Sequence, residues 1–162
     1  MFDLTAMTVG DLLRLYATLL EELRRRNVVR TANNPVADLA ESLFCGAFGW
    51  HRADKEAKGY DAENESGVRY EIKGRRLTQH NKSRQVSAIR SFDGFGILAG
   101  VLFNHDFSIL RAALVPVSIV KVRSEWVEHT NSWRFLLHDD VWKEPGVKDV
   151  TAELSRFMEA LK

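Results

Sequence analysis

The chain has 162 residues, 45% of them hydrophobic, and a formal net charge of +1 at pH 7. This length supports one domain with a buried core and is short for two. No apolar run approaches the roughly 18 residues of a membrane-spanning helix, and the N-terminus has an acid where a signal peptide has basic residues. A single cysteine, Cys45, excludes a disulfide framework. We therefore expect one domain over residues 1–162 of a soluble, cytoplasmic protein without a membrane partner.

The first predicted element is an amphipathic helix over residues 8–26, with Thr8 as its N-cap. Core packing is the favoured use of its apolar stripe, and a partner-binding surface is the alternative. The residues of this stripe recur at helical spacing and are Leu12, Leu15, Tyr16, Leu19, Leu20 and Leu23.

A second helix is predicted to begin at Asn34-Pro35, which reads as an N-cap followed by a first helical residue, and to end near Gly49. Glu41 lies at the margin of its apolar face. We expect its carboxylate to be partly desolvated or paired with a cation.

Beyond Gly49 the pattern changes to short strands with period-two alternation and turn residues between them. A polar, basic segment follows, in which residues 83–91 could form a short helix. Later segments predict a hairpin of buried strands, a helix opened by Pro116, a further strand and a closing amphipathic helix. The expected strands cover residues 48–54, 58–63, 67–74, 95–104, 108–115 and 133–137, and the two last helices cover residues 116–121 and 151–161.

Alternation along residues 67–74 places the side chains of Glu71 and Lys73 on one face of a strand and Ile72 on the other. The turn at residues 64–67 nearly bisects the interval from Asp61 to Glu71, so antiparallel pairing would bring Asp61 beside them. Two carboxylates and an ammonium would then share a small volume. With the Ile72 carbonyl, these groups suit a hard cation such as Mg²⁺ or Mn²⁺, while Lys73 can orient or deprotonate water.

The segment that follows is strongly basic, because Glu71 is the only acid between Arg69 and Arg90. Such a segment suits a polyanion if its side chains share one surface, although a solvated loop is the simpler reading. The residues expected to contact DNA phosphates are Arg75, Arg76, Lys82 and Arg84.

Together, Asp61 and the Glu71-Ile72-Lys73 triplet resemble the PD-(D/E)XK superfamily of restriction-endonuclease-like nucleases. The resemblance implies a mixed α/β fold with a core at about residues 35–115, in which helices flank a central mixed sheet. The helix at residues 8–26 would be an addition to that core. Tyr60 stands where the superfamily's name leads one to expect proline.

By this resemblance Asp61, Glu71, Lys73 and Glu41 are catalytic, and Asp61, Glu71, Glu41 and the Ile72 carbonyl bind metal. Gln85 is carried over as a polar residue near substrate or metal-bound water. The implied activity is hydrolysis of DNA phosphodiester bonds with Mg²⁺ or Mn²⁺. Cutting both strands would need a homodimer or a partner subunit, for which the first or last helix could supply the interface.

Two other classes of function remain open. The same fold could serve as a catalytically inactive nucleic-acid-binding or assembly module. Alternatively, the chain could be a small regulatory or antitoxin-like protein whose basic segment binds an acidic partner.

Overall fold

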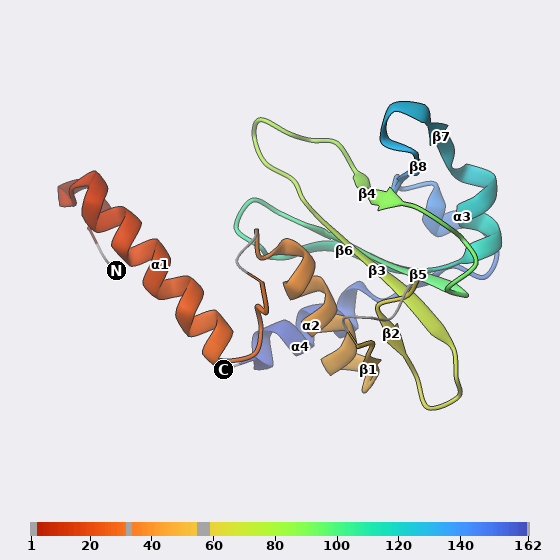
Figure 1. The fold of residues 1–162 in the computed structure, drawn as a ribbon, viewed down its shortest axis with the longest axis horizontal. Coiled ribbons are helices and arrows are strands. Elements are labelled where there is room, and N and C mark those ends of the chain that lie inside the picture. Colours follow the sequence, from red (N-terminus) through yellow and green to blue (C-terminus); the bar gives the residue numbers. More distant parts are fainter. Residues whose placement is uncertain (1–2, 32–33, 55–58, 162) are drawn as a thin grey trace.

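The computed structural model describes residues 3–31, 34–54 and 59–161 (Figure 1). Its strands are β1 (His51–Arg52), β2 (Ala62–Glu63), β3 (Arg69–Arg76), β4 (Gln85–Ile89), β5 (Ile97–Phe103), β6 (Ile109–Pro116), β7 (Glu125–Val127), β8 (Ser132–Leu136) and β9 (Lys148–Asp149). Its α-helices are α1 (Val9–Arg25), α2 (Val36–Phe48), α3 (Val117–Arg123) and α4 (Thr151–Ala160). Short 3₁₀ turns cover Leu4–Ala6, Glu128–Thr130 and Val141–Lys143.

The fold is mixed α/β and is built on a central six-stranded sheet with the order β1-β2-β3-β5-β6-β9. This sheet is mixed because β3 and β5 run parallel while the other neighbouring strands are antiparallel. A second sheet has the order β4-β8-β7. Within the described ranges, no helix is both long enough and apolar enough to cross a membrane.

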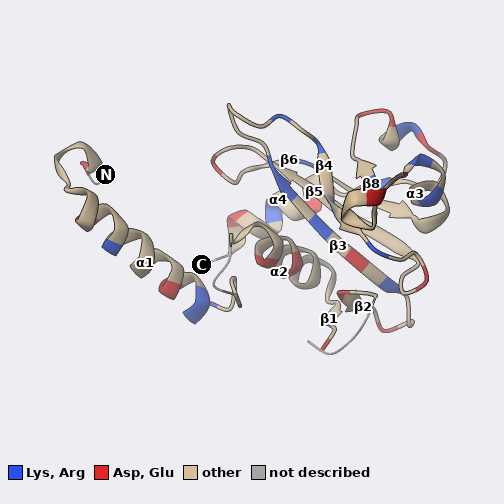
Figure 2. Ribbon diagram, turned by 45° about the horizontal axis from the view of Figure 1, so that its top comes forward, with Lys and Arg blue, Asp and Glu red and all other residues tan. Residues whose placement is uncertain are grey.

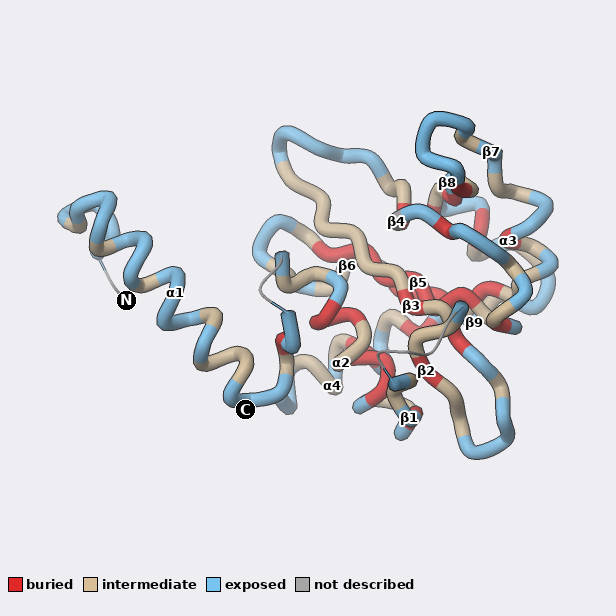
Figure 3. Tube along the Cα trace, in the orientation of Figure 1, coloured by how far each residue is buried: buried red, intermediate tan, exposed pale blue. Residues whose placement is uncertain are grey.

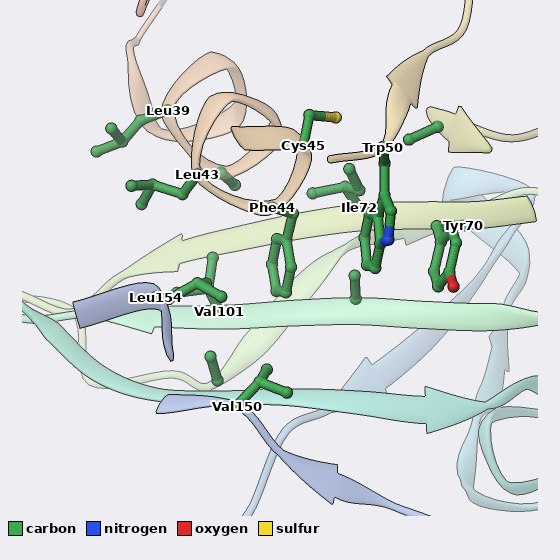
Figure 4. Packing of buried hydrophobic residues seen from close by; sticks show 14 of the residues in the cluster. Leu39, Leu43, Phe44, Cys45, Trp50, Tyr70, Ile72, Val101, Val150 and Leu154 are labelled. Atoms are coloured by element: carbon green, nitrogen blue, oxygen red, sulfur yellow. The ribbon is translucent and has the colours of Figure 1, made fainter. Parts of the chain in front are cut away.

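Alternation along the central strands buries side chains on both faces of the large sheet. One face packs against α2 and α4, where Phe44 and Leu154 are fully buried (Figure 4). The other face packs against α3 and the small sheet, around Leu98 and Phe135. The central strands are therefore the most buried part of the molecule (Figure 3).

Helix α2 begins and ends close to where the sequence predicts. The Asn34 side chain accepts a hydrogen bond from the Val36 amide, but the N-cap position is occupied by Pro35, so the helix starts one residue later than predicted. At the other end Gly49 adopts a left-handed conformation with φ 66°, which favours glycine and ends the helix.

The predicted hairpin register is confirmed. Ala62 pairs with Tyr70 and Glu63 with Arg69, so Asp61 falls opposite Glu71. The turn is closed by a 3.0 Å hydrogen bond from the Gly67 amide to the Asn64 carbonyl. Of the strand predicted over residues 58–63, only Ala62 and Glu63 form β2, and residue 58 lies outside the described residues.

The prediction of a short helix at residues 83–91 is wrong, because residues 85–89 form strand β4. Val86 and Ile89, three residues apart, match one face of a helix. A β-bulge between them lets both side chains reach the core from a strand instead. The connection from β3 to β5 therefore passes through a strand of the second sheet instead of the short helix expected there.

The prediction that α1 packs its apolar stripe into the core is also wrong. The helix forms as expected behind Thr8, whose side chain accepts a hydrogen bond from the Asp11 amide. All of residues 9–25 are described and none of them is buried, and the helix extends away from the sheets (Figure 1). Periodicity predicts an apolar face but not what covers it.

The remaining long elements follow the prediction. Strands β5 and β6 form the buried hairpin, α3 begins after Pro116, and α4 covers residues 151–160. Two short strands were not expected. Strand β7 pairs with the predicted β8, and β9 adds an edge to the central sheet from outside residues 35–115.

Candidate active site

Three of the predicted catalytic side chains meet at the junction of β2 and β3. The Lys73 Nζ atom lies 2.5 Å from Glu71 Oε1 and 4.0 Å from Asp61 Oδ2. Strand β3 carries positive and negative side chains along its length (Figure 2). Because β-strand side chains alternate, Ile72 points to the opposite face and is buried against α2.

Asp61 also takes part in the backbone pairing of β3. Its Oδ2 atom accepts a 2.7 Å hydrogen bond from the Ile72 amide. Asp61 directly precedes Ala62, the first residue of β2 that pairs with β3. The N–H and C=O groups of one strand residue point to the same edge. The Ile72 carbonyl therefore faces the edge of β3 at which Asp61 lies.

The electrostatics of this cluster favour a bound cation. Burial raises the pKa of Glu71, and the negative charges of Asp61 and Glu41 raise it further, while the ammonium of Lys73 opposes them. Two carboxylates thus share a poorly solvated volume with one ammonium, and a third carboxylate lies nearby. A divalent cation would offset their mutual repulsion.

An open groove of about 850 Å³ lies along this face of β3. Asp61, Glu71 and Lys73 line it together with the end of β4 and the loop after that strand. The residues that line the groove are Gly59, Tyr60, Asp61, Arg69, Glu71, Lys73, Ala88, Arg90, Ser91, Asp93 and Gly94. The charged cluster is therefore open to a large ligand.

Glu41, the fourth predicted catalytic residue, lies in an adjoining pocket of about 350 Å³ that Asp61 also lines. Its carboxylate forms a 2.6 Å ion pair with Arg30. Burial raises the pKa of Glu41, the Arg30 hydrogen bond opposes that rise, and the charge of Asp61 adds to it. Glu41 is thus near the cluster but paired with Arg30. This agrees with the expectation from the sequence that its carboxylate is partly desolvated or paired with a cation.

The residues predicted to contact phosphates do not share one surface. Arg75 is on the Lys73 face of β3, and its Nε atom donates to the Ser83 carbonyl. Arg76 is on the opposite face, where it donates to the His105 carbonyl and its guanidinium lies 4.2 Å from the Phe107 ring centre. The remaining residues lie beyond β3: Lys82 is exposed in the loop before β4, Arg84 forms a 2.7 Å ion pair with Asp139, and Gln85 begins β4.

Two arginines in the groove were not among the predicted site residues. Arg69 lies 4.6 Å from the Tyr60 ring centre and pairs with Glu63 at 2.8 Å. Arg90 is exposed and lines the groove directly after the end of β4. Both belong to the basic segment of the sequence, but alternation alone could not place Arg90, since the helix expected there is a strand.

A hard divalent cation suits the donors at this site. Over residues 3–31, 34–54 and 59–161, no three His, Cys, Asp or Glu side chains converge as a metal-binding group. Magnesium commonly uses only one or two carboxylates and keeps several waters. Asp61, Glu71 and the Ile72 carbonyl match that requirement.

Comparison with known proteins gives no family for this chain. No protein-family model matches it, and no curated protein matches its sequence.

Proposed function

We propose that this protein is a metal-dependent endonuclease that hydrolyses phosphodiester bonds in DNA, with a restriction-endonuclease-like core. The observation that carries the proposal is the meeting of Asp61, Glu71 and Lys73 on one face of β3, in a groove flanked by arginines. Three antiparallel strands followed by a parallel one, packed on α2, are consistent with such a core. The strand β4 in the crossover is a departure from it.

In this proposal Asp61, Glu71 and the Ile72 carbonyl hold Mg²⁺ or Mn²⁺. The cation supplies Lewis-acid polarisation of the scissile phosphate and acidifies water. Lys73 is held by its ion pair with Glu71, so its Nζ atom can orient the attacking water and offset negative charge on the phosphate oxygens. Arg69 and Arg90, which both line the groove, would contact the DNA backbone.

Glu41 has a supporting role in this proposal. It adds negative charge near the cluster, and its pocket shares Asp61 with the groove. Its ion pair with Arg30 would have to loosen before it could bind a second cation or a water.

The test is incubation of the purified protein with supercoiled plasmid and Mg²⁺ or Mn²⁺, with EDTA as the metal-free condition. We expect nicking or linearisation that needs the metal and is lost in Asp61→Asn. The matched control is Glu63→Gln, which alters a carboxylate on the same hairpin that pairs with Arg69 outside the cluster. Cleavage by Asp61→Asn at the wild-type rate would refute the proposed site.

The outcomes also separate the alternatives. If the wild type retards DNA on a gel but never cleaves it, the chain is a binding or assembly module. If it neither cleaves nor binds DNA, an acidic protein partner becomes the better hypothesis for the basic segment.

A further inference from the structure

Helix α1 is an amphipathic element whose apolar side chains lie in solvent. Val9 is 74% exposed, Leu13 is 64% exposed, and Tyr16 and Leu19 are each 55% exposed. Figure 3 shows the helix standing apart from the buried part of the molecule. An apolar face of this length is typical of a helix that packs against a partner.

Six large apolar residues of α1 are arranged symmetrically about Tyr16. At 3.6 residues per turn, these six fall within roughly 60° of Tyr16 around the helix axis, whereas Leu15 lies about 100° away. Each of the three that are N-terminal to Tyr16 has a counterpart at the same distance on its C-terminal side. The counterparts are Val9 with Leu23, Leu12 with Leu20, and Leu13 with Leu19.

Such a stripe is self-complementary when two copies of the helix run antiparallel. A twofold axis at Tyr16 places each apolar residue opposite its counterpart in the other copy, so the same surface serves both partners. The two helix dipoles then also run antiparallel, so the positive N-terminus of each helix lies beside the negative C-terminus of the other.

The charges of residues 3–26, the segment that contains α1, fit the same arrangement. Residues 3–14 contain two acids and one arginine, whereas residues 21–26 contain two acids and three arginines. The two ends therefore carry opposite net charges. Antiparallel pairing places the acidic end of one copy beside the basic end of the other, while a parallel pair would place like charges together.

The apolar stripe continues into a pocket at the base of α1. This pocket has a volume of about 350 Å³ and is lined mainly by apolar side chains. They come from the end of α1, the start of α2, the end of α4 and the segment after α1, and include Leu23, Val28, Val29, Leu39, Met158 and Leu161.

The register of the antiparallel pair reaches the edge of this pocket. It places Val9 of the second copy opposite Leu23, which lines the pocket of the first copy. The second copy can thus bring an apolar side chain to the mouth of that pocket.

We infer that α1 is the homodimer interface of this protein, paired antiparallel with α1 of a second copy about a twofold axis at Tyr16. A lipid surface is a poorer fit, because membrane-surface helices carry an excess of lysine and arginine on the polar face. On α1 the acids Asp11, Glu21 and Glu22 offset the arginines of that face. The inference does not depend on the proposed nuclease activity.

The first experiment is the mass in solution by light scattering at tens of micromolar protein. The chain mass is 18.5 kDa, and we expect the wild type to have twice that mass. Tyr16→Glu places two carboxylates at the twofold axis and should give a mass of one chain. Thr18→Glu adds the same charge on the opposite face of the helix and should leave the dimer intact.

Neither substitution touches the core, since no residue of α1 is buried, so circular dichroism should report the same fold for all three proteins. A wild-type mass of one chain would overturn the inference, including when the monomer binds vesicles of anionic lipid. A Tyr16→Glu protein that remains dimeric would overturn it as well.

A second experiment tests the orientation with a short bismaleimide cross-linker, in a Cys45→Ala background. Tyr16→Cys should cross-link to itself in the dimer. Val9→Cys and Leu23→Cys should not cross-link alone but should cross-link when the two proteins are mixed. Efficient cross-linking of Val9→Cys to itself would indicate a parallel pair and contradict the antiparallel assignment.

Discussion

At the scale of single residues, the proposed function of Lys73 depends on the two carboxylates beside it. It lies between Glu71 and Asp61 and is largely shielded from solvent. Lys73→Met keeps an unbranched side chain, shorter by the nitrogen, and removes its charge. Because water activation acts in the transition state, we expect the cleavage rate to fall by about 10²-fold or more while the Kd for DNA changes little.

The control for Lys73→Met is Lys148→Met, which alters an exposed lysine on β9 far along the sheet from the cluster. Single-turnover cleavage and a filter-binding isotherm should be measured on all three proteins. Parallel losses of binding and cleavage in Lys73→Met would assign the lysine to DNA binding.

Asp38 is a buried carboxylate with a structural use. It accepts hydrogen bonds from the Arg30 amide at 3.0 Å and from the Thr31 amide and hydroxyl, both at 2.8 Å. These bonds fasten the segment after α1 to the first turn of α2. Burial alone would raise the pKa of Asp38, but the hydrogen bonds from Thr31 and Arg30 outweigh it and hold that pKa below its usual value of 3.8.

We predict that Asp38→Ala lowers the free energy of unfolding by about 2–3 kcal/mol at neutral pH, because buried donors lose their acceptor. A depressed folded-state pKa stabilises the protein above the unfolded-state value, and this contribution is lost as the pH falls through the lower folded-state pKa. The difference in the free energy of unfolding between wild type and Asp38→Ala should therefore narrow below about pH 4. Urea denaturation of both proteins at several pH values measures this difference.

Glu153→Ala is the control for Asp38→Ala, since Glu153 is an exposed acid in the first turn of α4. It tests the helix-dipole contribution without the hydrogen bonds. An equal loss of stability in the two variants would argue against the proposed role of the hydrogen bonds.

At the scale of elements, the groove is shaped by two loops that touch backbone to backbone. A Cβ atom on Gly94 would lie 2.1 Å from the Gly59 carbonyl oxygen, which leaves no room for any other residue. Gly94→Ala must push apart the loop after β4 and the segment that leads to Asp61. We expect a loss of about 1–3 kcal/mol in stability together with reduced cleavage.

The neighbouring Gly96 provides the comparison for Gly94→Ala. A Cβ atom there would lie 4.0 Å from the Arg69 carbonyl oxygen, an ordinary contact. Gly96→Ala should therefore change the thermal midpoint and the cleavage rate much less. Equal effects of both substitutions would show that the close approach of the two loops is not the cause.

At the scale of the whole molecule, the net charge of +1 gives little general attraction for DNA. Attraction must come from local positive charge such as Arg69 and Arg90 beside the groove. We predict that Arg90→Ala weakens DNA binding and lowers the slope of log K against log salt by about 0.9, the value for one lost phosphate contact.

Binding isotherms at several salt concentrations test this prediction. Arg156→Ala is the control, because Arg156 is exposed on α4, which packs on the opposite face of the sheet. An unchanged slope in Arg90→Ala would exclude this side of the groove from the DNA path.

The sequence by itself determined the local features of this protein. Thr8 and Gly49 mark helix ends, and the Asn64 to Gly67 turn determines which residues of β2 and β3 face one another. Because strand alternation and hairpin register follow from nearby residues, the meeting of Asp61, Glu71 and Lys73 could be predicted.

Only the tertiary structure decided the features that depend on distant contacts. The spacing of Val86 and Ile89 suits a helix, but pairing with β8 and a bulge make that segment a strand. The same strand carries the chain to Arg90, and β3 turns Arg76 away from the groove. Likewise the stripe on α1 is visible in the sequence, yet only the fold leaves it uncovered, because burial depends on what the rest of the chain can bring against it.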